Sequence, residues 1–324
     1  MIEIKKFTET DKEFKELARI DNLVNHDSIA DPKEDKNDWN NRDKNLIRDR
    51  LLLYKGNQMI GVLYYSQGRD ENNRTTFYTL NLDPQYNHNG YRKLLYEKML
   101  DKVKVFNCNQ LHTSIYDHPN YAEHKKLIIK NGFELVQTNR EYSCNIQNID
   151  TKKYHSLINR LKSEDIHFYD SKEQMLPNKN RFPNHLKKIE ELEWTIEKDI
   201  PIPNGISHTR TPFDHWLKLC NDFYKNSYGI DVVAVYKNKY IGSTDIWVFK
   251  SEPHKGWTGS LGVLREFRRK GIATALKIIA IEKLVQKGIT ELRTDNEINN
   301  PMYKINEELG FIPVPFSLDY SKKI

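Results

Sequence analysis

Residues 263–274 read Val-Leu-Arg-Glu-Phe-Arg-Arg-Lys-Gly-Ile-Ala-Thr. They complete an apolar segment, Trp257–Leu264, that predicts a strand, and they run into Gly271–Gln286, whose apolar positions predict a long helix. The stretch is therefore predicted to form the loop that joins a strand to a helix.

This loop has two properties that suit an anion. Gly271 and Ala273 are small where the backbone has to come close to a ligand. The first N–H groups of the following helix have no partner within it and lie at the positive end of its dipole. Formal positive charge is added by Arg268, Arg269 and Lys270. The pattern fits either a cradle for a pyrophosphate or a basic loop that caps a helix, and spacing alone favours neither.

The same order of predicted elements occurs twice along the chain. In the first half the predicted strands are Ile2–Phe7, Leu51–Tyr54, Met59–Tyr65, Thr75–Leu82, Leu111–Tyr116 and Glu134–Gln137, and the predicted helices are Lys12–Leu23, Tyr91–Val105 and Tyr121–Lys130. In the second half the predicted strands are Asp165–Tyr169, Val232–Tyr236, Tyr240–Phe249, Trp257–Leu264 and Glu291–Thr294, and the predicted helices are Leu186–Glu197, Gly271–Gln286 and Pro301–Leu309. The repeat predicts a tandem duplication of an α+β domain, with domains 1–150 and 151–324.

Composition excludes several classes of protein. The chain has 324 residues and three isolated cysteines, Cys108, Cys144 and Cys220, with no CxxC pair. We therefore expect no disulfide framework and no metal site, and we expect a reducing cytoplasm. No segment approaches the roughly 18 apolar residues of a membrane helix, and the first residues lack the apolar region of a secretory signal. We therefore expect no membrane partner.

Charge is distributed unequally between the two halves. Residues 1–150 carry 23 Lys and Arg and 23 Asp and Glu, so the net charge of +6 lies in residues 151–324. A local positive excess fits an anionic ligand or an ordinary solvated surface. An excess of this size is far from that of a nucleic-acid-binding tail, and basic and aromatic residues show no clustering on one face, so we expect no nucleic-acid partner.

Arg268-x-x-Gly271-x-Ala273 after a strand resembles the acetyl-CoA signature of the GNAT superfamily of N-acetyltransferases. A second stretch falls at the spacing of that family's other cofactor motif: Asn299, Met302, Asn306, Leu309, Gly310 and Phe311. Two patterns in the right order are far more specific than one, and the match covers residues 230–314 most clearly. The resemblance implies two tandem GNAT-like domains, each a mixed, mostly antiparallel sheet flanked by helices. This layout is similar to that of mycothiol synthase.

The resemblance also implies where acetyl-CoA binds as cosubstrate. The backbone of Leu261, Gly262 and Val263 pairs with pantetheine like an added strand. The pyrophosphate is held by the amides of Arg269, Lys270, Gly271, Ile272, Ala273 and Thr274, with Arg268 in the signature. Asn299 falls where the family places an asparagine that contacts coenzyme A. A long polyanionic thioester suits an exposed strand edge followed by a helix N-terminus.

The implied reaction is attack of a neutral amine on the bound thioester. It needs a base, donors for the oxyanion and an acid for the leaving thiolate. The family often places a tyrosine acid four residues before the glycine of the second motif, where this chain has Asn306. Asparagine hydrogen-bonds a sulfur without protonating it. Tyr303, one turn earlier, is either the substitute acid or a surface tyrosine.

The base is less well defined than the cofactor loop. The strand Trp257–Val263 lacks the glutamate that the family often places there, and Asp245 on the preceding strand is the candidate, acting directly or through water. The alternatives are Asp295, Glu297 and His254, and a plain surface role is open for each candidate.

The corresponding loop of the first half departs from the signature. Gly90 matches Gly271 of the signature. Asn87 occupies the position of Arg268, where the family has a basic or amide residue, and Arg92 occupies the position of the small residue Ala273. An arginine there obstructs the backbone approach or contacts a phosphate instead. Counting back from Gly132 puts Tyr121 and Ile128 at the positions of Asn299 and Asn306, so neither position keeps its chemistry. We expect the first half to be a structural domain of the same fold.

Two functions follow from these patterns. The first is transfer of an acetyl group from acetyl-CoA to a primary amine of a small molecule or peptide, catalysed by the second half. The acceptor is expected between the halves or beside Asp199–Trp216, where an apolar wall or ordinary packing is formed by Pro201, Pro203, Phe213 and Trp216. The alternative is a non-catalytic acyl-CoA-binding or regulatory module. The sequence leaves the oligomeric state open.

Overall fold

The computed structural model describes residues 1–324 except residues 26, 70–74, 177 and 204–205. The chain packs as two compact units: unit 1 comprises Met1–Asn139, Ile202–Thr209 and Pro315–Ile324, and unit 2 comprises Arg140–Pro201 and Arg210–Val314. The domain bounds 1–150 and 151–324 describe the repeat in the sequence and stay a prediction. The compact units differ from them, because the chain divides after Asn139 and its C-terminal segment belongs to unit 1.

Unit 1 is a sheet in the order β1-β2-β3-β4-β5-β12 with flanking helices. Its elements are β1 (Ile2–Lys6), α1 (Asp11–Val24), α2 (Pro32–Asn41), β2 (Arg48–Lys55), β3 (Gln58–Gln67), β4 (Thr75–Leu82), α3 (Tyr91–Val103), β5 (Gln110–Tyr116) and α4 (Ala122–Lys130). The final strand is supplied by β12 (Ile312–Lys323), whose residues Ser317–Lys323 pair antiparallel with β5. Local sequence explains the start of α1, because Thr10 and Glu13 form a capping box there.

Unit 2 repeats the pattern in the order β6-β11-β10-β9-β8-β7. Its elements are the end of β6 (Glu134–Asn145), α5 (His155–Ser163), β7 (Ile166–Asp170), α6 (Ser171–Gln174), α7 (His185–Glu197), α8 (Phe213–Asn226), β8 (Ile230–Tyr236), β9 (Lys239–Val248), β10 (Lys255–Val263), α9 (Ile272–Gln286), β11 (Glu291–Glu297) and α10 (Tyr303–Glu308). In both units one central pair is parallel, β4 with β5 and β10 with β11, and the other registered pairs are antiparallel. The predicted α+β repeat is confirmed.

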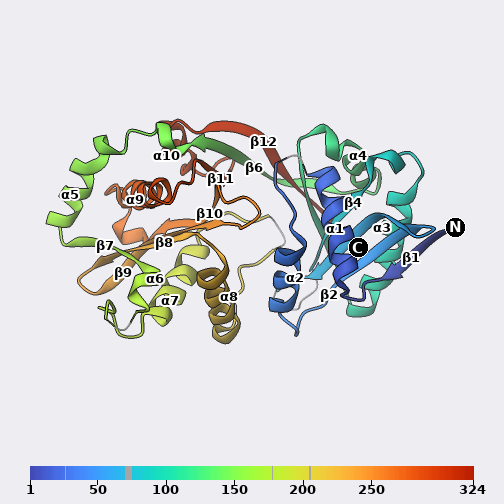
Figure 1. Ribbon diagram of the computed structural model, residues 1–324, viewed down its shortest axis with the longest axis horizontal. Coiled ribbons are helices and arrows are strands. Elements are labelled where there is room, and N and C mark those ends of the chain that lie inside the picture. The colour runs from blue at the N-terminus through green and yellow to red at the C-terminus, as the bar shows by residue number, and fades with distance from the viewer. Residues whose placement is uncertain (26, 70–74, 177, 204–205) are drawn as a thin grey trace. The chain divides into compact units, whose positions relative to one another are not determined.

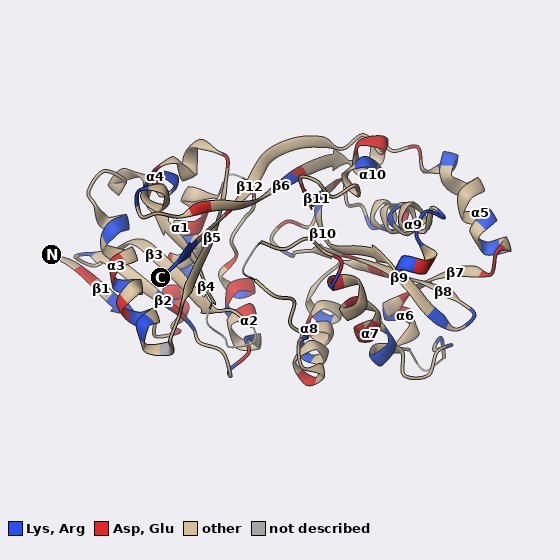
Figure 2. Cartoon of the chain, turned by 180° about the vertical axis from the view of Figure 1, so that it is seen from behind, with Lys and Arg blue, Asp and Glu red and all other residues tan. Residues whose placement is uncertain are grey.

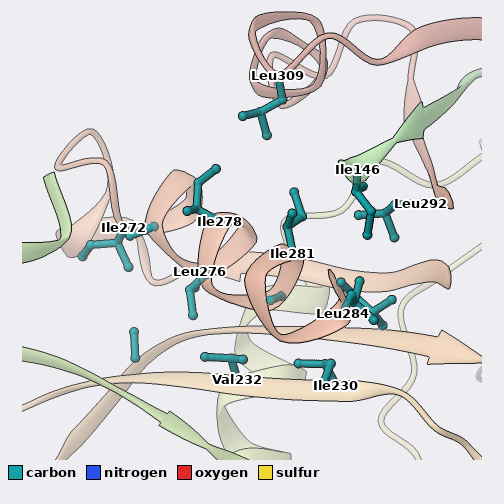
Figure 3. Close-up of a cluster of buried hydrophobic side chains, with 14 of the residues drawn as sticks. Ile146, Ile230, Val232, Ile272, Leu276, Ile278, Ile281, Leu284, Leu292 and Leu309 are labelled. Carbon is teal, nitrogen blue, oxygen red and sulfur yellow. The ribbon is translucent and has the colours of Figure 1, made fainter. Parts of the chain in front are cut away.

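The core of unit 2 lies on both faces of its sheet. Helix α9 is on one face, and α7 and α8 are on the other (Figure 1). Alternate residues of β8 divide accordingly: Ile230 and Val232 belong to the cluster around α9, whereas Val233 belongs to the cluster around α7. Figure 3 shows the first cluster, in which α9 side chains such as Leu276 lie between β8 and Leu309. Because α9 is apolar almost all round, it holds its N-terminus rigidly against the sheet.

Most predicted elements are confirmed, and the differences are local. Strand β6 continues to Asn145, beyond the predicted Glu134–Gln137, and the predicted helix Tyr91–Val105 ends at Val103. Helices α2, α5, α6 and α8 were not predicted. Residues 199–203, at the start of the segment expected to lie beside the acceptor, are outside helices and strands. In the described ranges no helix is both long and apolar enough to cross a membrane.

Candidate active site

The basic loop before α9 has an unusual backbone. Gly271 is the residue before the helix and has φ +86°, a conformation that other residues rarely adopt. Arg269 has φ +61° although it carries a side chain, and strained backbone of this kind concentrates at ligand-binding loops. The loop is held by Arg160, which donates to the carbonyl of Lys270 over 2.9 Å. The loop is therefore preformed.

The loop offers a row of free donors. Across the described part of the chain, the backbone N–H groups from Arg269 to Thr274 have no acceptor, and the first bond into α9 is from Ala275 to Gly271. These donors lie at the positive end of a helix, where a phosphate satisfies them. Arg269 and Lys270 are exposed beside them. The predicted pyrophosphate cradle therefore has the donor set that its ligand requires.

Arg268 is engaged differently from its neighbours. Its Nε donates to the carbonyl of Val263 over 2.9 Å, and its Nη2 pairs with Asp199, which also pairs with Arg265. The hydrogen bond from Arg265 is the main cause that holds the pKa of Asp199 well below its usual range, followed by that from Arg268. Arg268 therefore ties the end of β10 to the loop that follows α7.

Strands β10 and β11 separate after a short contact. They pair in parallel only from Lys255 to Trp257, opposite Glu291 to Arg293. Strand β10 continues to Val263 with β9 on its other side, so from Thr258 onward its second edge pairs with no strand among the described residues. This separation opens the edge of β10 that the cofactor was predicted to pair with.

Alternation along β10 decides which backbone groups face the open edge. Leu264 donates to Ile241 of β9, so Gly262, two residues earlier, also directs its N–H and C=O groups to β9. The groups of Leu261 and Val263 then face the open edge, which agrees with the bond from Arg268 to the Val263 carbonyl. Gly262 provides space instead, because a side chain there would overlap Ile196 of α7.

Asp245 lies beside this edge at an irregularity in the sheet. The register between β9 and β10 shifts between Thr258 and Ser260, so Gly259 bulges opposite Asp245. The carboxylate of Asp245 accepts from Ser260 Oγ and, over 2.9 Å, from Trp247 Nε1. Burial raises the pKa of this carboxyl, and these hydrogen bonds act in the opposite direction.

Asp245 lines a cavity of about 470 Å³ between the sheet and helices α7 and α8. Its polar members are mostly acidic, and no described residue that lines it is Lys, Arg or His. Aromatic and apolar side chains form the rest of the wall. The lining residues are Glu193, Ile196, Glu197, Ile200, Trp216, Leu219, Cys220, Phe223, Tyr224, Asp231, Ser243, Asp245, Trp247, Gly259 and Ser260.

Two further carboxyl groups in this cavity have raised pKa values. Burial, and next the charge of Asp231, raise the pKa of Glu193 to about 8, although Glu193 accepts from Trp216 Nε1 over 2.7 Å. Burial also raises the pKa of Asp231 to about 7, opposed by the 2.5 Å bond from the Tyr224 hydroxyl. Groups that titrate near neutral pH beside a cavity are typical of sites that bind or deprotonate an amine.

The two catalytic candidates of α10 do not line this cavity. Tyr303 is half-buried, with the guanidinium of Arg140 5.1 Å from its ring. Asn306 is buried and bonded to Lys277 and Asn296. A role for either in catalysis stays a prediction.

The remaining predicted residues are mostly at the surface. Asn299 is exposed, and both its backbone N–H and its side-chain amide donate to Glu297. Asp295 and His254 are exposed as well. The three alternative bases do not line the described cavity that contains Asp245; they are Asp295, Glu297 and His254.

Sequence reasoning missed Glu193, Asp231 and Gly259. A single acid within the apolar segment Ile230–Tyr236 is a signal for Asp231, and a glycine inside a strand is a signal for a bulge at Gly259. Glu193 lies in a helix rich in acids, and its position on the buried side depends on the packing of α7 against α8. Of the four residues proposed as an apolar wall, Trp216 lines the cavity, and Phe213 stacks on it with ring centroids 5.8 Å apart.

The corresponding loop of unit 1 is closed by Arg92. This side chain is 6% exposed and turns inward, donating to the carbonyl of Leu80 over 3.2 Å and to Asn87 Oδ1 over 3.0 Å. Gly90 keeps the left-handed backbone before α3, with φ +72°. The loop geometry thus persists in unit 1, while the guanidinium is used for internal bonds.

Residues with positive and negative side chains are scattered over both units, as Figure 2 shows. Within the described ranges, no group of His, Cys, Asp and Glu side chains is arranged to hold a metal ion.

Comparison with known proteins matches residues 186–311 to the acetyltransferase (GNAT) family. A curated relative, N-alpha-acetyltransferase 30 of Dictyostelium discoideum, is 28% identical over 129 residues, which are 38% of this chain and 62% of that protein. The chain therefore spans less than two thirds of that relative.

Two solved structures share the fold over nearly the whole chain. A tandem GNAT protein from the clavulanic acid biosynthesis pathway, without AcCoA, is 14% identical, with a TM-score of 0.77 over 100% of this chain and 98% of that one. A GCN5-related N-acetyltransferase from Sphaerobacter thermophilus is 14% identical, with a TM-score of 0.69 over 99% of this chain and 95% of that one. These likenesses establish a tandem GNAT fold.

Proposed function

Because the domain over residues 186–311 belongs to the GNAT family of acetyltransferases, we propose that this chain transfers an acetyl group from acetyl-CoA to a primary amine of a small molecule or peptide. The reaction takes place in unit 2. Acetyl-CoA supplies the acyl group as an activated thioester, and the chain's own residues bind it, orient the amine and accept its proton.

The observation that carries this proposal is the continuity of two features. The open edge of β10 presents the N–H and C=O groups of Leu261 and the N–H group of Val263, whose carbonyl accepts from Arg268, and six residues later the free amides of Arg269–Thr274 begin. A strand edge followed by an anion-binding helix end matches a ligand that has an amide-containing arm joined to a pyrophosphate. Arg269 and Lys270 add positive charge where the phosphates lie in this proposal.

The acceptor amine occupies the cavity beside Asp245. An ammonium group is favoured there because the described lining contains carboxyl groups and no cation. The aromatic faces of Trp216 and Trp247 add an attractive surface for a cation. Because Ser260 lines the cavity and Leu261 faces the open edge, the amine and the thioester meet at the bulge.

Asp245 is the proposed base. Its raised pKa makes the carboxylate a better proton acceptor than an exposed aspartate. It takes the ammonium proton, and the neutral nitrogen then forms a bond to the acyl carbon and releases a second proton to solvent. The bond from that carbon to sulfur breaks with its electron pair left on sulfur, which afterwards takes up a proton. The N–H of Leu261 at the open edge is placed to stabilise charge on the acyl oxygen.

An assay of thiol release tests the proposal. The chain is incubated with acetyl-CoA and a panel of small amines, amino sugars and short peptides, and free coenzyme A is measured against the rate without amine. We expect release that depends on at least one amine, with the acetylated amine detected by mass spectrometry. Tight acetyl-CoA binding without amine-dependent release from any class would instead indicate the non-catalytic acyl-CoA-binding module.

A further inference from the structure

Lys277 is a buried lysine that the proposed reaction has not yet used. It lies in α9, is 2% exposed, and its Nζ donates to Oδ1 of Asn306 in α10. Its ammonium also lies 4.5 Å from the centroid of the Phe311 ring. Burying the charged form of a lysine at this depth costs a large desolvation free energy, which only favourable interactions of the ammonium group can offset.

The bond from Lys277 fixes the orientation of Asn306. An ammonium group only donates, so it is the oxygen of the Asn306 amide that faces Lys277. The amide nitrogen is then directed away, and it donates over 2.7 Å to Asn296 Oδ1 in β11. Its second hydrogen has no acceptor among the described residues. The structure therefore holds a buried, oriented and unused N–H donor.

This donor lies on the β11 side of the opening between β10 and β11. Pairing of the two strands ends at Arg293, and Asn296 lies beyond that point in β11. The opposite side of the opening is the free edge of β10, along which the proposed thioester lies. An amide donor is suited to a thiolate, which accepts hydrogen bonds.

Resting on the proposed function, we propose that Lys277 is a positioning residue that acts through Asn306 to stabilise the thiolate of coenzyme A as it leaves. The charge of Lys277 polarises the Asn306 amide and strengthens its free N–H as a donor. When the carbon–sulfur bond breaks, the electron pair stays on sulfur, Asn306 donates to it, and sulfur later takes a proton from solvent. No proton passes through the amide.

The titratable neighbour of Lys277 is uncharged, so Lys277 is the group that can supply positive charge to Asn306. Cys144 of β6 is the titratable neighbour whose charge acts on the lysine, and burial raises the pKa of that thiol, so it is neutral. Burial, opposed by Cys144, lowers the pKa of Lys277 to about 7. A negative sulfur nearby favours the protonated lysine, so bound thiolate and charged Lys277 stabilise each other.

The product complex provides a test that needs no acceptor and no turnover. Coenzyme A is bound to the full chain, and the pKa of its thiol is measured from the ultraviolet absorbance of the thiolate as pH is varied. We expect Lys277→Met, which keeps the length and removes the charge, to raise this thiol pKa by about one unit, a tenfold change in ionisation. Asn306→Leu is expected to raise it similarly, and Lys277→Arg to retain the wild-type value.

The outcomes separate this inference from the proposed function. Equal thiol pKa values in wild type and Lys277→Met, with equal affinity for coenzyme A, would overturn the role of Lys277 alone. Absence of coenzyme A binding by the wild-type chain would overturn the proposed function as well. A methionine is less costly to bury than a lysine, so Lys277→Met is expected to fold, and circular dichroism checks this. Asn306→Leu keeps the lysine and gives an independent reading.

Discussion

Gly259 and Asp245 face each other so closely that a methyl group on Gly259 would lie 2.0 Å from Oδ2 of Asp245. This contact exists because the bulge in β10 brings the backbone of Gly259 onto the carboxylate. It connects the cofactor strand with the proposed base, and any side chain at position 259 would have to displace the carboxylate.

Gly259→Ala is expected to displace the Asp245 carboxylate and to lower turnover about 10- to 100-fold, while acetyl-CoA affinity stays near that of the wild type. Gly256→Ala is the matched control. It adds the same methyl group to the same strand, 3.0 Å from Ile246 and away from Asp245. Steady-state kinetics of both variants check this. Equal turnover in the two would show that the contact between Gly259 and Asp245 has no role in the reaction.

Asp245→Asn is expected to lower turnover about 100-fold or more without weakening acetyl-CoA binding, because an amide accepts no proton. In the wild type the raised pKa of Asp245 predicts that turnover increases with pH as the carboxyl ionises, above the usual range of an aspartate. This increase disappears in the variant. Asp214→Asn, at an exposed site in α8, is the control with the same change of charge. Turnover of Asp245→Asn equal to the control would remove Asp245 as the base.

Glu193→Gln is expected to change the pH dependence of stability. In the folded chain the pKa of Glu193 is about 8, against an ordinary value of 4.5, so between these values the folded state binds more protons than the unfolded state. Unfolding free energy should therefore decrease as pH rises from 5 to 8, and the glutamine variant should be more stable than the wild type at pH 8 by on the order of 1 kcal/mol. Denaturant titrations at pH 5 and pH 8 measure this. A wild type that loses no stability relative to the variant over that range would contradict the buried position of Glu193.

Arg92→Met is expected to leave kcat and the KM for acetyl-CoA unchanged, because Arg92 uses its guanidinium inside unit 1. The variant should unfold at a lower temperature, since loss of bonds from a buried charged group costs about 1–3 kcal/mol. Kinetics at 20 °C and a thermal melt separate the two effects. A large rise in KM for acetyl-CoA would show that Arg92 contributes to the cofactor site.

Much of the fold follows from local sequence. The nearly continuous apolar run of β8 predicts a strand because both faces of this sheet are covered, and the apolar length of α9 predicts a helix. The loop before α9 was predictable from its residue types. Gly271 has a left-handed backbone, which few residues other than glycine tolerate. The cradle of free amides follows directly from that helix start.

The acceptor side was not predictable in the same way. Glu193 and Asp231 come together only because α7 and α8 cover one face of the sheet, and their raised pKa values result from burial that sequence spacing does not encode. The return of β12 to unit 1 is likewise a tertiary choice. Lys277 looked like any polar residue of a helix, and its bond to Asn306 depends on the packing of α10 over α9.

Calorimetric titration with acetyl-CoA of the wild type, Gly271→Arg and Gly90→Arg tests the central claim most directly. The two glycines precede equivalent helices with φ +86° and φ +72°, so both substitutions impose similar backbone strain. The side chain at position 271 must in addition displace Leu157, whose Cδ1 would lie 2.7 Å from the added Cβ, so a check of folding accompanies the Gly271→Arg titration. We predict that the wild type binds one acetyl-CoA per chain, that Gly271→Arg abolishes binding, and that Gly90→Arg retains it. Undiminished binding by Gly271→Arg, or its loss in a folded Gly90→Arg chain, would contradict a cofactor site in unit 2.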